Sequence, residues 1–434
     1  MEEHMKKIKI GMLGIGNIGQ GTYRTLEMSR ARIEETTGLD LEITKILNRH
    51  PERDRGIDIP REKYVTDIHE IIDDPEIDIV VELIGGIEPA TTFMADALRA
   101  GKHVVTANKA AIAANGELLQ KLAHENHLML RFEASVAGGI PILNAVTTAL
   151  ISNEFSEVQG ILNGTTNYIL TKMTENGQAY ADALRDAQAK GFAETDPTAD
   201  VEGLDAANKL SILISLLFGI GVAPDQIPTR GITTVTSEDI AFAREFGYRI
   251  KLLGSARARD GEVTCHVEPS LVPEDHPLAN VNNEFNAVYV TGNAVDKLMF
   301  YGRGAGPLPT GSAVMGDIIS IARKIEKNAA YDLLPHLRYD AGLSFAGEGK
   351  NPYYIRVTAP DHPGVLGQIT STFGVYGVGI RTMMQRAVSS HSDTVPLIFI
   401  VYAIEKNILS TALDVLVGNG SVLRVDNVLR VLDS

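Results

Sequence analysis

The stretch KIKIGMLGIGNIG, residues 7–19, decides the fold of the first part of the chain. Its first half, KIKIGML, is a short apolar run that predicts a buried β-strand. The motif G-x-G-x-x-G, formed by Gly14, Gly16 and Gly19, follows directly, and a helical pattern continues to about residue 28. In that context the first glycine permits a tight turn, the second lets a pyrophosphate approach the backbone, and the third lets helix and strand pack closely. The alternative is a glycine-rich turn without a ligand.

The pattern of a strand followed by a helix then repeats. Four further apolar runs predict strands, at 41–47, 78–84, 103–107 and 127–132. Two longer patterns predict helices, at 89–100 and 110–125. This alternation with continuously apolar strands is typical of a parallel sheet covered on both faces. The sequence therefore predicts an α/β protein with a Rossmann-type dinucleotide-binding domain, in which Asn17 and Ile18 start the helix that faces the phosphates.

Two segments that follow strands are candidates for contacts with the cofactor or substrate, because ligands of open α/β sheets bind beyond the carboxyl ends of the strands. Asn48 and Arg49 follow the second strand, where an NAD-selective site has an acid. Arg49 instead offers a partner for the 2′-phosphate of NADP; the alternative is a solvated loop arginine. Thr106 and Lys109 follow another strand, where Lys109 faces the nicotinamide or the substrate, or is simply an exposed lysine at a helix start.

A second decisive stretch is GFAETDPTADVEGLDAANK, residues 191–209. A helix is predicted from about residue 201 into the apolar run 210–218. On this helix Asp205 and Lys209 are four residues apart and share one face, while Glu194 lies in the loop before them. Such a cluster is suited to binding an amino acid and moving a proton. The alternative is a helix N-terminus with a structural ion pair.

Composition narrows the class of protein. A chain of 434 residues exceeds what one hydrophobic core organises, so two or three domains are expected. The formal net charge of −15 argues against nucleic-acid and membrane partners. With Cys265 as the only cysteine, an intrachain disulfide and a cysteine-based metal centre are excluded. The first residues lack the apolar segment of a signal peptide, so a cytoplasmic location is expected.

The middle of the chain mixes strand and helix signals. The small residues of EASVAGGIP, 133–141, allow close backbone approach. We expect a strand and then a polar turn within 158–167, and a helix at 180–190 that Gly191 ends. Further strands are expected at 263–268, 288–291 and 298–301. A second glycine loop, 302–306, precedes a helix to about residue 327 and predicts a return to the nucleotide domain, or a simple interdomain turn.

The last third, which follows a glycine-containing linker at 341–351, has the order βαββαβ of a ferredoxin-like unit. The strands are expected at 353–358, 379–387, 395–404 and 422–431, with one helix opening at 361–366 and another at 408–417. A small sheet of this kind exposes an edge that suits pairing with a second copy.

Taken as a whole, the chain resembles the homoserine dehydrogenases of the three-part type, with nucleotide-binding, catalytic and ACT domains. The resemblance covers essentially the full length, and the loop at 361–366 resembles the ligand loop of ACT regulatory domains. It rests on the glycine loop, TANK at 106–109, EASVAGGIP at 133–141, ILNGTTNYI at 161–169 and GFAETDPTADVEGLDAANKL at 191–210. It implies a dinucleotide-binding domain at 1–135, completed by about 306–330, an α+β catalytic and dimerisation domain at 136–305, and a ferredoxin-like (ACT) domain at 351–434.

The resemblance also implies an activity: reduction of L-aspartate 4-semialdehyde to L-homoserine by NADPH or NADH, in the biosynthesis of threonine, methionine and isoleucine. Lys209 matches the family's acid–base lysine, and Glu194 and Asp205 match the acids that hold homoserine. Lys109 matches a lysine at the junction of cofactor and substrate, and Gly306 a late cofactor contact.

Three further features are implied by the resemblance alone. Backbone carbonyls match a sodium site, at Glu133, Val136, Gly138 and Ile140. The ACT loop implies feedback by L-threonine or another amino acid, bound through Asp361, Gly364, Val365 and Leu366. The alternative is a domain that only holds subunits together. The expected assembly is a homodimer or a homotetramer.

The residues fit this chemistry independently, because a positioned ammonium stabilises the developing alkoxide and donates a proton. Asp205 is expected to keep the pKa of Lys209 high, which suits a proton donor; whether Lys209 or Lys109 donates is open. The competing interpretations are a dehydrogenase of 2-hydroxy acids with an ACT domain, a non-catalytic sensor of NAD(P) and an amino acid, and a purely structural oligomer.

Overall fold

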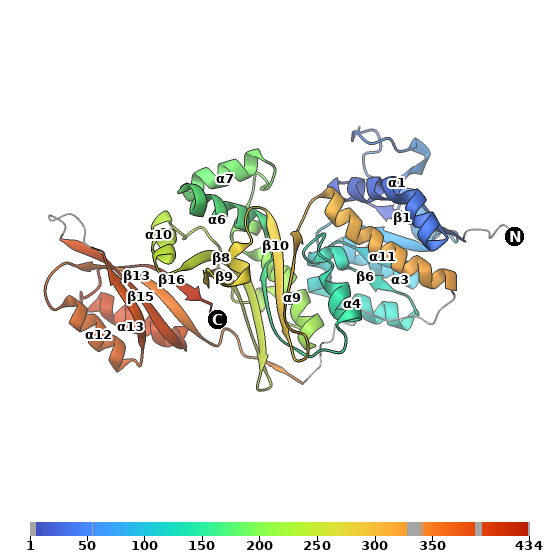
Figure 1. The fold of residues 1–434 in the computed structure, drawn as a ribbon. Coiled ribbons are helices and arrows are strands. Elements are labelled where there is room, and N and C mark those ends of the chain that lie inside the picture. The colour runs from blue at the N-terminus through green and yellow to red at the C-terminus, as the bar shows by residue number, and fades with distance from the viewer. Residues whose placement is uncertain (1–5, 54, 328–338, 340–341, 387–392, 433–434) are drawn as a thin grey trace.

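The computed structural model describes residues 6–53, 55–327, 339, 342–386 and 393–432. The chain is arranged in a row: a parallel sheet with its helices at one end, a mixed sheet in the middle, and the continuation of that sheet with two helices at the other end (Figure 1). In the described residues no helix combines the length and apolar character needed to cross a bilayer.

The N-terminal sheet has six strands, and every neighbouring pair is parallel. In spatial order they are β3 (Tyr64–Val65), β2 (Leu39–Leu47), β1 (Lys6–Leu13), β4 (Ile79–Glu82), β5 (His103–Thr106) and β6 (Leu130–Arg131). This 3-2-1-4-5-6 order is that of the Rossmann fold, so the α/β prediction is confirmed. Only β3 was not expected, because two residues leave no periodic signal.

Helices cover both faces of this sheet, and the long ones are α1 (Asn17–Thr37), α3 (Ala90–Arg99), α4 (Lys109–Glu125) and α11 (Pro307–Lys327); short turns of helix lie at η1 (Arg61–Lys63) and α2 (His69–Ile72). Helix α1 extends beyond the predicted end at residue 28. The prediction was too short because the second half of the helix is polar, with only Ile33 buried. Helix α11 packs so closely on α1 that a Cβ atom at Gly21 would lie 2.0 Å from the carbonyl oxygen of Pro307. The second glycine loop therefore does return the chain to the nucleotide domain.

The second sheet continues through the middle and the end of the chain, and a strand of two residues, β12 (Ser344–Phe345), pairs beside it with β9. Its main path runs β11 (Asp296–Arg303), β10 (Phe285–Gly292), β7 (Phe155–Ile161), β8 (Tyr248–Arg259), β9 (Glu262–Pro273), β16 (Arg424–Val431), β13 (Lys350–Pro360), β15 (Thr394–Glu405) and β14 (Ile380–Gln385). Strand β8 was missed, because charged residues and a glycine interrupt its apolar run; one of them, Lys251, is buried.

The helices of the middle part are α5 (Ile142–Asn144), α6 (Gly164–Asn176), α7 (Tyr180–Ala189), α8 (Thr198–Val201), α9 (Leu204–Phe218) and α10 (Ser237–Glu245), with shorter turns at η2 (Glu133–Ser135), η3 (Ala145–Ala149), η4 (Pro224–Gln226) and η5 (Pro277–Asn280). The helix expected at 180–190 is confirmed. Two expectations are wrong. The polar residues at 163–167 do not form a turn; they cap and begin α6. The helix expected to run from residue 201 is split, because Gly203 takes a left-handed φ of 84° between α8 and α9.

The C-terminal unit confirms the order βαββαβ, with α12 (Val365–Val375) and α13 (Lys406–Gly418) between its strands. Its sheet is not separate, however. Strand β16 pairs in parallel with β9, Arg430 with Ser270 and Val431 with Leu271, so that within the described residues the free edge of this unit is β14. Residue 387, where the second strand was expected to end, and residue 341 of the linker lie outside the described residues.

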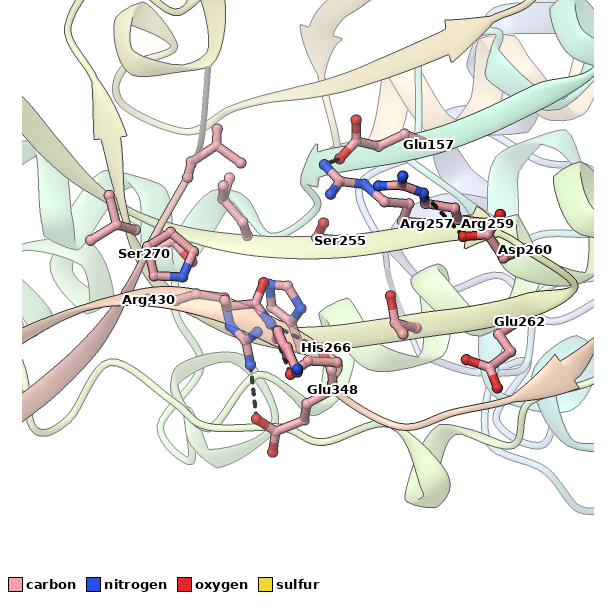
Figure 2. A pocket seen from close by; sticks show the side chains of 18 residues that line it. Glu157, Ser255, Arg257, Arg259, Asp260, Glu262, His266, Ser270, Glu348 and Arg430 are labelled. Atoms are coloured by element: carbon pink, nitrogen blue, oxygen red, sulfur yellow. Dashed lines mark hydrogen bonds and ion pairs between the residues drawn. The ribbon is translucent and has the colours of Figure 1, made fainter. Parts of the chain in front are cut away.

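Buried charges hold this unit to the middle of the molecule. Arg356 on β13 donates to fully buried Asp239 on α10 (Nε–Oδ1 2.7 Å), which also accepts from Asn427 on β16 (2.9 Å). At the β9–β16 junction, Arg430 donates to Glu268 on β9. It also donates to Glu348 at 2.8 Å (Figure 2). Because a buried charge without its partner is expensive, these contacts fix how the two parts of the sheet meet.

Replacing Arg356 with methionine should lower the free energy of unfolding by about 3–5 kcal/mol, because Asp239 is left as a buried carboxylate without its cation. Urea unfolding followed by circular dichroism measures the change. The matched control is Arg259→Met, since Arg259 pairs with Asp260 on an exposed strand end (side chains 78% and 88% exposed) and should unfold like the wild type. Equal curves for all three proteins would contradict the assignment of Asp239 as the anchor of the C-terminal unit.

Candidate functional site

The glycine loop lies where β1 passes into α1. Gly14 has a φ of 100°, and a Cβ atom at Gly19 would lie 2.5 Å from the carbonyl oxygen of Gly14, so both positions require glycine. A Cβ atom at Gly16 would meet nothing within 4 Å. Gly16 is also the N-cap of α1, without a side-chain cap and without an acid in the first turn of the helix. The loop therefore leaves open space beside a positive helix end, which fits the pyrophosphate of a dinucleotide.

The carboxyl ends of the neighbouring strands form the rest of this crevice. Glu82, the last residue of β4, is fully buried and accepts from the backbone N–H groups of Ile84 (2.7 Å) and Gly85 (3.1 Å) and from Thr106 Oγ1 (2.6 Å). Thr106 thus lies at the strand ends where the sequence placed it. Glu82 itself was missed, although an acid closing an apolar strand was a usable signal.

The end of β2 is basic. Arg49 is exposed directly after the strand, and Arg55 returns to the same turn by donating to Asn48 Oδ1 at 3.1 Å. No acid stands at this strand end to accept from a ribose hydroxyl. The turn therefore offers guanidinium groups where a 2′-phosphate would lie.

The acid–lysine cluster is assembled from two parts of the chain. Asp205 lies in the first turn of α9, and its Oδ2 accepts from Lys209 Nζ one helical turn later at 2.7 Å. Its Oδ1 lies 2.7 Å from Nζ of Lys109, the first residue of α4 in the nucleotide-binding part. Asp205 and Lys209 are each only 7% exposed. One buried carboxylate therefore joins two lysines that are far apart in the sequence.

Further groups surround this carboxylate. Lys209 Nζ also donates to the carbonyl oxygen of Leu162 at 2.7 Å. Asn163 Nδ2 donates to Asp205 Oδ2 (2.9 Å) and to Asp200 Oδ1 (2.7 Å), and Thr165 Oγ1 lies 3.2 Å from Asp200 Oδ2. Asn163, Thr165 and Asp200 were not among the predicted site residues. Asp200 could not be recognised from local patterns, because its partners come from residues 163–165.

The charges of the cluster shift one another's pKa values. Burial raises the pKa of Asp205, but the ammonium groups of Lys209 and Lys109 outweigh it and hold that pKa well below its usual range. Asp205 raises the pKa of the half-buried Lys109. Burial lowers the pKa of Lys209, helped by repulsion from Lys109. The expectation that Asp205 keeps the pKa of Lys209 high is therefore wrong, because burial, together with repulsion from Lys109, outweighs the charge of Asp205.

The remaining acid, Glu194, is exposed in the loop before α8. Its backbone carbonyl accepts from Gln188 Nε2 at 3.0 Å, and its charge adds to that of Asp205 in raising the pKa of Lys109. Glu194 thus lies near enough to the cluster for its charge to act on Lys109. Burial also raises the pKa of Asp200.

The segment with the predicted sodium ligands packs against the second glycine loop. A Cβ atom at Gly138 would lie 2.4 Å from the carbonyl oxygen of Gly304, and Gly139 N donates to Arg303 O at 3.1 Å. Gly306, at the end of that loop, has a φ of 121° just before α11. The two glycine-rich segments therefore approach each other closely, at the return to the nucleotide-binding part.

The donor set of this segment suits a hard monovalent cation. The carbonyl oxygen of Glu133 accepts only a long bond of 3.4 Å from Val136 N, while that of Ile140 accepts from Ile142 N at 2.8 Å. A carbonyl oxygen that accepts one hydrogen bond has a second lone pair, and hard cations take backbone oxygens. Among the described side chains, no group of three or more His, Cys, Asp or Glu residues is placed to hold a metal. A cation here would rest on carbonyl groups.

A cavity of about 430 Å³ lies away from this chemistry, over β8, β9 and the end of β16 (Figure 2). Its charged residues pair with one another, Arg257 with Glu157 at 2.6 Å and Arg430 with Glu348 at 2.8 Å. The charges that line it are thus largely satisfied within the protein. The chemistry points instead to the glycine loop, the carboxyl ends of the parallel strands and the Asp205 cluster.

Fold and site together define the class of protein, an oxidoreductase that uses a dinucleotide cofactor. Residues 14–133 match the family model described as Homoserine dehydrogenase, NAD binding domain, and residues 141–319 match the one described as Homoserine dehydrogenase. The chain belongs to the homoserine dehydrogenases.

Similar proteins cover nearly the whole chain. A homoserine dehydrogenase from Bacillus subtilis is 39% identical over 92% of each chain, and one from Pseudomonas aeruginosa is 40% identical over 97% of this chain and 99% of its own. The crystal structure of a homoserine dehydrogenase from Thiobacillus denitrificans matches with a TM-score of 0.91 at 36% identity, covering 99% of both chains. A hyperthermophilic archaeal homoserine dehydrogenase in complex with NADPH matches 76% of this chain and 100% of its own, with a TM-score of 0.63 at 26% identity.

Replacing Asp205 with asparagine should cost about 3–5 kcal/mol of unfolding free energy at pH 7, because two ammonium groups lose their carboxylate. Part of this loss should be recovered at pH 9. A lysine whose pKa is lowered on folding binds fewer protons in the folded state, so stability rises with pH up to the unfolded value near 10.5. In the Asp205→Asn variant the pKa of Lys209 is lowered further, so stability rises with pH over a wider pH range. Urea unfolding at both pH values measures the effect.

The control for this comparison is Asp182→Asn, since Asp182 forms an exposed ion pair with Arg185 on α7. It should leave the stability unchanged at both pH values. An Asp205→Asn protein that loses the same free energy at pH 7 and pH 9 would show that no buried ammonium titrates in this window.

Proposed function

We propose that the chain reduces L-aspartate 4-semialdehyde to L-homoserine with NADPH or NADH, in the biosynthesis of threonine, methionine and isoleucine. The observation that carries this proposal is the Asp205 carboxylate shared by Lys109 and Lys209 at 2.7 Å each, beside the Rossmann-type crevice. An aldehyde reduction needs a cation where negative charge develops on oxygen, and a proton to complete the alcohol.

In this proposal Lys209 is the proton donor. Its ammonium group is fixed by Asp205 and by the carbonyl oxygen of Leu162, so its position is set before the substrate arrives. Burial and the repulsion from Lys109 make it a stronger acid than a free lysine, which favours transfer of its proton to an alkoxide. In homoserine oxidation the same lowered pKa makes neutral Lys209 available as the base. The nicotinamide cofactor supplies or accepts the hydride when bound.

Lys109 is assigned to the junction of cofactor and substrate. It begins α4 at the carboxyl end of the parallel sheet, and its raised pKa keeps it charged. A permanent cation at this place orients the substrate oxygen and stabilises its charge without giving up a proton.

Glu194 and Asp205 are the proposed counter-charges of the substrate ammonium. Asp205 already accepts from two lysines and from Asn163, whereas Glu194 and Asp200 have fewer charged neighbours. The three carboxylates outnumber the two lysines, so the site favours a ligand that brings an ammonium group. A hydroxy acid without an amino group does not offer that charge.

For the cofactor, we propose contacts from the first glycine loop, the strand ends and the second glycine loop, at Gly14, Gly16, Asn17, Ile18, Gly19, Arg49, Thr106, Lys109 and Gly306. The archaeal relative whose structure was solved binds NADPH, and Arg49 and Arg55 at the end of β2 favour NADP in this chain. NAD also serves as the cofactor if its ribose, which carries a 2′-hydroxyl in place of the 2′-phosphate, binds tightly enough. The ratio of rates with the two cofactors decides between them.

A sodium ion on the carbonyl oxygens of Glu133, Val136, Gly138 and Ile140 is also proposed. Its support is the packing of this segment on the loop 302–306, so that a cation there would stiffen both walls of the crevice. Equal rates and equal melting temperatures in sodium chloride and in tetramethylammonium chloride would refute the proposal.

The C-terminal unit is proposed to be an ACT domain that binds L-threonine and lowers the activity. The support is the βαββαβ order and the loop before α12, where Asp361 N donates to Asp393 O (3.0 Å), Gly364 has a φ of 97°, Val365 is buried and Leu366 is exposed. The alternative is a unit that only joins subunits into a homodimer or homotetramer, to which the open edge β14 is suited. Threonine that changes neither rate nor melting temperature would favour that alternative.

The experiment that tests the proposed function is the initial rate of L-homoserine oxidation by the purified protein, run separately with NAD and NADP. Reduced cofactor should appear with homoserine and not with L-serine or L-threonine. The rate should be higher with NADP, and Arg49→Ala should lower the NADP rate more than the NAD rate. Folded protein without turnover with either cofactor would refute the proposal and favour a non-catalytic sensor.

Lys209→Ala should lower kcat by about two to four orders of magnitude, the usual contribution of a positioned acid or base, while the Kd of the cofactor stays within about twofold. Steady-state rates and quenching of the reduced-cofactor fluorescence measure the two quantities. Lys121→Ala, which removes an exposed lysine of α4, is the control and should behave like the wild type. Loss of cofactor binding in Lys209→Ala would contradict its assignment to proton transfer.

A further inference from the structure

Asn163 stands between two acids of the site, the buried Asp205 and the half-buried Asp200. It is 4% exposed and precedes α6, at the point where the chain leaves β7. Its Nδ2 donates to Asp200 Oδ1 at 2.7 Å and to Asp205 Oδ2 at 2.9 Å. One side-chain amide therefore bridges a carboxylate of α8 and a carboxylate of α9, two helices separated by the turn at Gly203.

The orientation of this amide is set from both sides. Its Oδ1 accepts from the backbone N–H of Thr166 at 2.9 Å and from Thr166 Oγ1 at 2.9 Å, which is the N-cap interaction of α6. The N-cap must accept a hydrogen bond from a backbone N–H group, whereas the two carboxylates can only accept hydrogen bonds. The amide oxygen must therefore face Thr166 and the amide nitrogen must face the acids. The start of α6 thus aims two N–H bonds at the acids.

The two acids differ in what else they contact. Asp205 is held by Lys109 on one oxygen and by Lys209 on the other. Among the described residues, no lysine forms an ion pair with Asp200; its carboxylate accepts from Asn163 Nδ2 and Thr165 Oγ1. Asp200 is thus the less compensated of the two carboxylates.

We propose that Asn163 is a positioning residue for the reaction: it holds Asp200 at a fixed separation from Asp205, so that the carboxylate not neutralised by the lysines faces the ammonium group of the substrate. This inference rests on the proposed function. It assigns to Asn163 a task in the site beyond capping α6. Without its Nδ2, Asp205 keeps its lysines, but Asp200 loses the donor that fixes its orientation.

The same geometry predicts a pH signature. Burial raises the pKa of Asp200 and the negative charge of Asp205 adds to this, while the bond from Asn163 and the charge of Lys209 oppose it. The charges of Asp200 and of Glu194, in the loop before α8, also act on Lys109 at the start of α4. Removing the Asn163 donor raises the pKa of Asp200 further, so a higher pH is needed to ionise it.

The test compares Asn163→Ser and Asn163→Asp with the wild type. Serine and aspartate both cap helices about as well as asparagine, so α6 keeps its N-cap in each variant, whereas neither variant donates to two carboxylates as the amide does. In Asn163→Ser, kcat/KM for homoserine should fall roughly ten- to a hundredfold, as expected for hydrogen bonds to charged groups. Cofactor Kd and melting temperature should remain close to the wild-type values.

The acidic limb of the kcat/KM profile should also move to higher pH in Asn163→Ser. Asn163→Asp, which keeps the shape of the side chain, should lose at least as much activity, because it places a third carboxylate against Asp200 and Asp205. If Asn163→Ser melts at a lower temperature than the wild type, Asn163→Asp takes its place in the comparison of kcat/KM and its pH dependence.

Wild-type kcat/KM and an unmoved acidic limb in a folded Asn163→Ser protein would overturn the proposal and leave Asn163 as a helix cap. An equal loss of cofactor affinity and of homoserine kcat/KM would overturn it as well, because the residue would then support the whole crevice. Absence of homoserine turnover in the wild type would refute the proposed function instead, and the two failures are thereby distinguished.

Discussion

The ion pairs of Asp205 are the contact on which the site depends. Its carboxylate accepts Lys209 from its own helix and Lys109 from α4, the first helix beyond β5 of the parallel sheet. These two bonds connect the nucleotide-binding part with the middle of the chain, directly beside the crevice for the cofactor. The buried carboxylate needs its cations, and the buried ammonium of Lys209 needs this carboxylate, so the contacts among the three groups fix one another. Deep burial, with repulsion from Lys109, lowers the pKa of Lys209, whereas the charge of Asp205 raises the pKa of the more exposed Lys109.

The rest of the fold brings these groups to one place. The Rossmann order of the first sheet collects the glycine loop, Glu82 and Thr106 at one edge, and α11 returns from residue 307 to pack on α1. The second sheet carries Asn163 at the end of β7 and continues through the β9–β16 pair into the C-terminal unit. A single sheet therefore links that unit to the strands that support the site.

Local patterns in the sequence predicted the parallel sheet, the glycine loop and the βαββαβ order of the last third, because each has a periodicity or motif within a few residues. They also placed Asp205 and Lys209 on one helix face. What they did not show depends on contacts between distant segments. Asn163 and Asp200 are 37 residues apart and meet only in the folded chain. The pKa of Lys209 was assigned in the wrong direction, since neither burial nor the approach of Lys109 is visible in the spacing of Asp205 and Lys209.

The most direct test of the account is the pH dependence of kcat for homoserine oxidation in the wild type and in Lys109→Met. The wild type should gain activity as Lys209 loses its proton, with a limb below 10.5, the ordinary pKa of lysine. In Lys109→Met the repelling charge is gone while Asp205 remains, so the limb should move to higher pH. A limb at the same pH in both proteins, or one that disappears in the variant, would contradict the claim that Lys209 is the titrating acid–base group and that Lys109 lowers its pKa.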